Sequence, residues 1–317
     1  MPLAGVLRPA LLAAARSPKA ERAITRVPAT KSLVDRFVAG TSTPDAVAAT
    51  RDVLSTGRFV TIDHLGEDVT DAQQATANVE HYLDLLDALS AISDAAAVTR
   101  PTEISLKLSA LGQSLPRDGH KVALENARTL CTAAEAAGAW VTVDAEDHTT
   151  TDSTLSIVAE LREDFPSLGT VLQAYLKRTE ADCAELSWSR IRLCKGAYRE
   201  PASVAHQGAA VDEAYVRCLR VLMNGTGYPM VATHDPAMIA AATRLALAAG
   251  RTTRDFEFQM LHGIRDAEQR TLVADNHRLR VYLPYGDQWY GYFMRRLAER
   301  PANLAFFLRA VAGSAGR

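Results

Sequence analysis

The chain has 317 residues, of which 48% are hydrophobic and 23% charged, and its formal net charge is −2. This composition is typical of a globular protein with a sizeable core, and the length suits one large α/β domain or two smaller ones. A net charge so close to zero provides no extended field for nucleic acid or an anionic membrane, so any anion site must be local.

The first 50 residues or so have helical periodicity. Residues 1–31 contain six Lys or Arg residues and a single acid, Glu21. The stretch resembles either a transit peptide or a basic surface helix, but it has no clear apolar segment followed by a cleavage site. We therefore expect residues 1–50 to form an N-terminal helical segment that stands outside the main domain.

From residue 59 onward, short β-branched or apolar runs alternate with longer stretches of helical periodicity. The sequence predicts eight strands, at Phe59–Asp63, Glu103–Leu108, Trp140–Asp144, Thr170–Ala174, Ile191–Cys194, Met230–Thr233, Phe256–Met260 and Arg280–Leu283. A helix is predicted after each strand, at Asp71–Ser93, His120–Ala137, Asp152–Phe165, Thr179–Ser187, Val211–Met223, Pro236–Ala249, Asp266–Asn276 and Asp287–Arg300.

This alternation predicts an α/β fold of the (βα)₈ barrel type over residues 51–308, followed by a short tail at 309–317. A doubly wound sheet is the competing architecture. That fold would bind a dinucleotide at a Gly-x-Gly-x-x-Gly turn, and no such motif follows a predicted strand.

Polar residues gather where the predicted strands end, which is where (βα)₈ barrels carry their chemistry. They are Lys107, Asp144, Gln173, Arg192, Lys195, Thr233, His234, Gln259 and Tyr282. Each alone could be an ordinary loop contact. Together they predict a bound polar ligand, because buried charges need partners.

Counting charges gives a first idea of this ligand. The cations Lys107, Arg192, Lys195, Arg295 and Arg296 outnumber the expected acids Asp144 and Glu299. We therefore expect two anionic groups, one a substrate carboxylate and one a cofactor phosphate. The neutral donors and acceptors suit a heteroaromatic ring system and a ribityl chain. The histidines do not have metal-binding spacing, so no metal is expected.

The segment from Tyr282 to Glu299 is the most specific single feature. It places the adjacent Arg295 and Arg296 on a predicted helix, and several tyrosines precede them in the sequence. Guanidinium groups offer a fixed fork of donors that could clamp a small carboxylate under an aromatic roof. The ordinary alternative is a surface helix with two solvated arginines.

Two other functions fit the same residues. A Schiff-base aldolase on this barrel would use Lys107 or Lys195 as its nucleophile. A barrel without catalytic activity could bind an anionic ligand or a partner protein through the same polar rim. The residues alone leave both readings open.

Seven segments, in order, resemble those of the proline dehydrogenase family. They are Ser105–Leu111, Asp144–Glu146, Leu172–Arg178, Ile191–Tyr198, Ala232–Asp235, Phe256–Leu261 and Tyr282–Glu299. The resemblance covers roughly residues 33–308, and the length is similar to that of the monofunctional bacterial form. It implies a distorted (βα)₈ barrel that holds FAD noncovalently at the strand ends, with the last helix over the barrel mouth. The implied reaction is oxidation of L-proline to Δ1-pyrroline-5-carboxylate by hydride transfer to flavin N5, the first step of proline catabolism to glutamate.

The resemblance also implies a role for each matching residue. The substrate carboxylate would be held by Lys107, Arg295 and Arg296, and the pyrrolidine ring would pack on Leu261, Tyr282 and Tyr292. Asp144 and the neighbouring Ala145 would lie under the flavin, with Arg192 near N5 and Gln173 near the pyrimidine side. The rest of the cofactor would be held by Lys195, Gly196, Ala197, Tyr198, Thr233, His234 and Gln259, with Glu299 fixing a guanidinium.

Partners and location follow from the same resemblance. It implies a quinone or another electron acceptor and functional coupling to a separate pyrroline-5-carboxylate dehydrogenase; no nucleic acid partner is expected. The four cysteines form no C-x-x-C pair, and no apolar run is long enough to span a membrane. We therefore expect a cytoplasmic protein, and a quinone acceptor would be compatible with peripheral contact at the inner membrane.

Overall fold

The computed structural model describes residues 34–67, 69–95 and 100–299, and their side chains except those of 93–95 and 295–299. Eight parallel strands close into a barrel in chain order. They are β1 (Phe59–His64), β2 (Thr102–Leu106), β3 (Trp140–Val143), β4 (Gly169–Gln173), β5 (Arg190–Cys194), β6 (Tyr228–Ala232), β7 (Glu257–Leu261) and β8 (Leu279–Tyr285). The predicted (βα)₈ barrel is confirmed, and every predicted strand boundary lies within two residues of the observed one.

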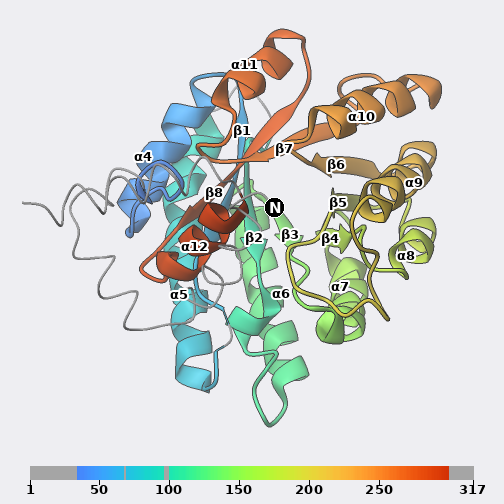
Figure 1. Cartoon of the computed structure of the whole chain (residues 1–317). Helices are drawn as coiled ribbons and strands as arrows, with labels where there is room; N and C mark the ends of the chain where they lie inside the picture. Colours follow the sequence, from blue (N-terminus) through green and yellow to red (C-terminus); the bar gives the residue numbers. More distant parts are fainter. Residues whose placement is uncertain (1–33, 68, 96–99, 300–317) are drawn as a thin grey trace, which may run out of the picture.

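Helices follow the strands as predicted, and all but the last of them surround the barrel (Figure 1). They are α5 (Ala72–Ala95), α6 (Gly119–Ala136), α7 (Thr151–Asp164), α8 (Thr179–Glu185), α9 (Ala210–Asn224), α10 (Pro236–Ala248), α11 (Asp266–Ala274) and α12 (Trp289–Glu299). Short 3₁₀ helices, η1 (Leu108–Leu111) and η2 (His148–Thr150), follow β2 and β3. The predicted second strand extends two residues too far, because β2 ends at Leu106 and Leu108 already belongs to η1.

An additional helix, α4 (Thr43–Leu54), precedes β1. Ser42 and Asp45 form a capping box that satisfies the free N–H groups at its start. The helix packs against β1, β8 and α5, so it covers the wall where the last strand meets the first. Residues 1–33 lie outside the described part of the chain, and the division into 1–50, 51–308 and 309–317 stays a prediction.

The last helix, α12, lies over the carboxyl ends of the strands, inside the ring of the other helices (Figure 1). Its residues Tyr290, Phe293 and Met294 belong to one buried apolar cluster with Leu65, after β1, and Ile264, after β7. The expected position of the last helix over the barrel mouth is therefore confirmed. Among the helices that the structure describes, none combines the length and apolar character needed to cross a bilayer.

The barrel interior is unusually polar. Such barrels are normally filled by layers of branched apolar side chains. Here Arg192 of β5 reaches Glu103 of β2 with 2.6 Å between nitrogen and oxygen, and Arg280 of β8 bonds Glu257 of β7 at 2.7 Å. Because β2 and β5 are not neighbours in the barrel, the first of these contacts must cross its interior. The apolar core lies instead between the strands and the surrounding helices.

Candidate active site

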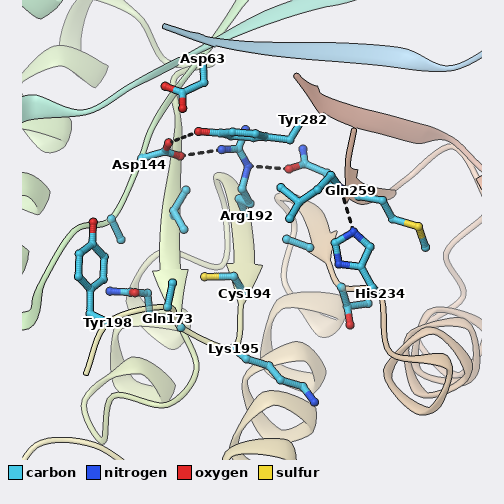
Figure 2. A pocket seen from close by; sticks show the side chains of 18 of the residues that line it. Asp63, Asp144, Gln173, Arg192, Cys194, Lys195, Tyr198, His234, Gln259 and Tyr282 are labelled. Carbon is cyan, nitrogen blue, oxygen red and sulfur yellow. Dashed lines mark hydrogen bonds and ion pairs between the residues drawn. The ribbon is translucent and has the colours of Figure 1, made fainter. Parts of the chain in front are cut away.

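A cavity of about 570 Å³ opens at the carboxyl ends of the strands. Its lining includes every predicted site residue whose side chain the structure describes: Lys107, Asp144, Ala145, Gln173, Arg192, Lys195, Gly196, Ala197, Tyr198, Thr233, His234, Gln259, Leu261, Tyr282 and Tyr292. Figure 2 shows many of these side chains around the cavity. The side chains of Arg295, Arg296 and Glu299 lie outside the described part of the chain; their backbone belongs to α12.

Asp144 is the centre of the cavity floor. It directly follows β3, and its carboxylate accepts hydrogen bonds from Arg192 Nη1 at 2.7 Å and Tyr282 Oη at 2.8 Å (Figure 2). It also accepts one from Ser105 Oγ at 2.8 Å. These donors come from β5, β8 and β2. One carboxylate therefore fixes side chains from three other strands.

Arg192 is held on all sides. Besides Asp144, its guanidinium donates to Glu103 at 2.6 Å and to Gln259 Oε1 at 2.6 Å, and it lies 5.4 Å from the centre of the Tyr282 ring. Burial alone would lower the pKa of Arg192, but the two carboxylates raise it overall. Arg192 is therefore a permanent, immobile positive charge beneath the cavity.

Lys107 forms a buried ion pair that the sequence analysis missed. Its Nζ lies 2.7 Å from both carboxylate oxygens of Asp63, 3.6 Å from Asp144 and 3.4 Å from Tyr282 Oη. Burial opposes the charge on Lys107, yet Asp63 in particular holds the pKa of this amine well above its usual value. Asp63 is the last residue of the predicted first strand, so its position at a strand end was the signal that could have found it.

Lys195 at the rim is also paired. It lies 2.5 Å from Asp212 and 2.9 Å from Asp235, and its side chain is about one-third exposed. The expectation that cations outnumber acids is therefore wrong for the described part of the site. Each cation there has carboxylate partners, drawn from Asp63, Glu103, Asp144, Asp212 and Asp235.

Gly196 lets the loop after β5 run close to a buried aromatic ring. Its φ is +118°, and a Cβ placed there would lie 2.4 Å from the ring of Tyr175. Both facts require glycine at this position. Gly196 and Ala197 line the cavity, so glycine at this position lets the loop run between the cavity and the Tyr175 ring.

His234 and Gln173 are oriented by backbone groups. His234 Nε2 accepts the N–H of Leu261 at 2.9 Å, so the ring carries its proton on Nδ1 (Figure 2). Gln173 Nε2 donates to the carbonyl of Glu146 at 2.8 Å. These contacts give the cavity walls fixed donors and acceptors before any ligand binds. Reasoning from the sequence also left out further lining residues, Glu67, Val171, Ala232 and Met260.

Together, the closed barrel and its cavity of charged strand-end residues are typical of a (βα)₈-barrel enzyme. A family model described as proline dehydrogenase matches residues 46–309. The chain belongs to the proline dehydrogenase family, and its role is accordingly the oxidation of proline in proline catabolism.

Relatives agree with this assignment. Proline dehydrogenase of Deinococcus radiodurans is 40% identical over 285 residues, covering 88% of this chain and 90% of the relative. Proline dehydrogenase 2 of Bacillus subtilis is 38% identical over 279 residues, covering 87% and 89%. The match over nearly the whole of both relatives fits the predicted monofunctional form.

A solved structure shares the fold. Proline utilization A from Bdellovibrio bacteriovorus, inactivated by N-propargylglycine, superposes with a TM-score of 0.80 at 24% identity. It covers 85% of this chain, which spans 32% of that longer chain.

Proposed function

We propose that this chain oxidises L-proline to Δ1-pyrroline-5-carboxylate with FAD held noncovalently in the cavity at the carboxyl ends of the strands. The observation that carries the proposal is the floor of that cavity, where a buried guanidinium, Arg192, is fixed by Asp144, Glu103 and Gln259. These bonds fix the orientation of the guanidinium before a ligand binds, so its position relative to a group bound above it is set in advance.

The residues present fit a flavin dinucleotide. The volume of about 570 Å³ lies within the roughly 300–1,000 Å³ common for ligand pockets. Gln173, Thr233, His234 and Gln259 offer neutral donors and acceptors, and Lys195, with its partners Asp212 and Asp235, stands beside the backbone of Gly196 at the rim. When bound, FAD supplies the two-electron acceptor for the hydride that leaves C5 of the proline ring.

The substrate carboxylate needs more positive charge than the floor provides. Lys107 is compensated by Asp63, and Arg192 by Asp144 and Glu103. We propose that Arg295 and Arg296 hold the carboxylate together with Lys107. Support comes from α12, because Tyr292 lines the cavity, and positions three and four residues later share its helix face.

The remaining contacts would orient the pyrrolidine ring. Leu261, Tyr282 and Tyr292 line the cavity and provide its apolar surface. The hydroxyl of Tyr282 is already engaged by Asp144 at 2.8 Å, so its ring is held in one orientation. Fixed placement of C5 against the acceptor is what the protein would add to the rate.

The Schiff-base alternative is disfavoured by the lysines themselves. A lysine nucleophile must be neutral to attack a carbonyl. The pKa of Lys107 is held well above its usual value despite burial, because Asp63 and Asp144 stabilise its charge. The pKa of Lys195 is also raised, with burial opposing the effect and Asp212 and Asp235 causing it.

The proposed reaction leaves two products to be passed on, the cyclic imine and the electrons of the reduced cofactor. The imine hydrolyses without help to glutamate semialdehyde, which a separate pyrroline-5-carboxylate dehydrogenase would oxidise. The electrons would pass to a quinone, and peripheral contact with a membrane would give access to an acceptor that resides in lipid.

The direct test is the absorbance spectrum of the purified chain. We expect a flavin band near 450 nm that bleaches when L-proline is added without oxygen and stays unchanged with D-proline. A colourless protein that takes up no added FAD would refute the proposal. Trapping of a substrate on a lysine by borohydride would favour the aldolase instead.

A further inference from the structure

A second cavity, of about 230 Å³, lies at the opposite end of the barrel from the candidate active site. Its lining comes from the amino ends of the strands: Trp140 begins β3, Arg190 begins β5 and Tyr228 begins β6. Arg100 and Arg278, just before β2 and β8, also line it. The cavity thus gathers arginines and aromatic rings that the proposed reaction does not use.

The arginines are stacked on the aromatic rings. The guanidinium of Arg100 lies 4.5 Å from the centre of the Trp140 ring. That of Arg190 lies 4.4 Å from Trp140 and 5.0 Å from Tyr228, so it is sandwiched between the two. Arg100 is also held at a φ of +51°, in the left-handed region. These contacts hold the cations in place, but a ring face is a poor acceptor for an N–H donor.

The donors of these arginines are poorly satisfied. Arg190 Nε is buried and has no hydrogen-bond partner. Within the described part of the chain, Arg100 and Arg278 form no ion pair, and the one hydrogen bond of Arg278 is a long one, 3.4 Å to Tyr228 Oη. Arg280 differs, because its guanidinium donates hydrogen bonds to Glu257 and to a backbone carbonyl. It therefore lines the cavity without offering free donors to a ligand.

The charges of the residues around this cavity indicate which class of ligand it would suit. Glu257 is paired with Arg280, and Glu103 is shared by Arg190 and Arg192. Arg100 and Arg278 form no ion pair with a described residue, although Asp255 lies near enough to Arg278 to interact with its charge, so the cavity has an excess of positive charge. An unpaired buried N–H costs about 1–3 kcal/mol, so an acceptor bound at Arg190 Nε would stabilise this end of the barrel.

We propose that this cavity binds a small doubly charged oxyanion of the phosphate class through Arg100, Arg190 and Arg278. The guanidinium fork matches the oxygen geometry of such an ion, and the stacked rings hold the forks in place. The cavity is too small for a nucleotide but has room for an ion of five heavy atoms. The site is independent of the proposed flavin chemistry.

The test is a titration of the full chain with inorganic phosphate at constant ionic strength, with chloride as the balancing salt. We expect a saturable rise in the thermal midpoint and a saturable change in tryptophan fluorescence. Arg100→Gln and Arg278→Gln should each weaken binding about tenfold or more, because each removes a charge-assisted hydrogen bond. Arg244→Gln is the matched control: it removes one charge from the exposed face of α10, outside the cavity and the pocket beside it, and should bind like the wild type.

Three outcomes would overturn the proposal. Phosphate could act no differently from chloride at equal ionic strength. Saturable binding could survive both Arg100→Gln and Arg278→Gln, which would assign it to another site, such as the rim around Lys195. Finally, Arg244→Gln could weaken binding as much as the two cavity variants, which would mean that phosphate responds only to the net charge of the protein.

Discussion

Replacement of Glu103 by glutamine tests the buried ionic interior most directly. Glu103 is fully buried and accepts hydrogen bonds from Arg192 at 2.6 Å, Arg190 at 3.1 Å and Thr61 at 2.7 Å. Removing one partner of a buried ion pair typically costs about 3–5 kcal/mol, because the other charge is left uncompensated. Glu103→Gln should therefore lower the free energy of unfolding by about 3 kcal/mol at pH 7.

The pKa of Glu103 leads to the same magnitude. Burial raises it, but Arg280, Arg192 and Arg190 together bring it from the ordinary 4.5 down to about 2. Each tenfold change in proton affinity corresponds to about 1.36 kcal/mol, so the ionised Glu103 stabilises the folded chain by about 3 kcal/mol above pH 4.5. As the pH falls from 4.5 toward 2, the unfolded chain takes up a proton that the folded chain does not, and the stabilisation is lost.

The assay is urea unfolding of both proteins, followed by far-UV circular dichroism and by tryptophan fluorescence. The difference between wild type and Glu103→Gln should be about 3 kcal/mol at pH 7 and about 2 kcal/mol at pH 3.5. Glu180→Gln is the control, because Glu180 forms a half-exposed ion pair with Arg217 and should change stability by less than about 1 kcal/mol. A difference for Glu103→Gln as small as that of the control, or one that grows as the pH falls, would refute the reasoning.

Four further variants address the active site. Arg295→Lys or Arg296→Lys should reduce kcat/KM for proline by about tenfold to a hundredfold, because a fork of donors becomes a point charge; an unchanged KM for proline would contradict the carboxylate clamp. Tyr282→Ser should weaken proline binding but admit hydroxyproline, and steady-state kinetics with both substrates would expose a wrong assignment if their ratio stayed the same. Gly196→Ala should lower the flavin content of the purified protein, because its Cβ has no room, whereas Gly250→Ala, with open space around it, should retain the flavin.

The barrel could be predicted from the sequence because its signal is local. Each strand is a short apolar run and each helix a longer periodic one, so the alternation is visible without any long-range contact. The ends of the elements carry their own signals. Pro236 begins α10, and Asp235 caps it by accepting the N–H of Ala237.

The site could be predicted for a related reason. Parallel strands in a barrel all point the same way, so polar residues that follow different strands must meet at one rim. Lys107, Asp144 and Arg192 are far apart in the sequence, yet they lie within one hydrogen-bonded cluster. The strand order alone was enough to bring them together.

The partners of these residues were missed because they depend on which strands face each other across the barrel. Glu103 opens an apolar run, where an acid looks like a strand boundary rather than a core residue. Its partner Arg192 is 89 residues away on a strand that is not adjacent to its own. Asp63 was counted within a strand, so its charge was left out of the balance at the rim.

The buried ion pairs of the barrel interior are better explained by the positioning of Arg192 than by a gain in stability. Apolar residues of similar volume often stabilise a core as well as buried ion pairs do, or better. An apolar interior, however, could not hold a charged guanidinium beneath the active-site cavity. Glu103 and Asp144 do so, and Glu103 also contacts Arg190 at the amino end. One carboxylate therefore sets the charge at both ends of the barrel, so its loss should affect stability and the position of Arg192 together.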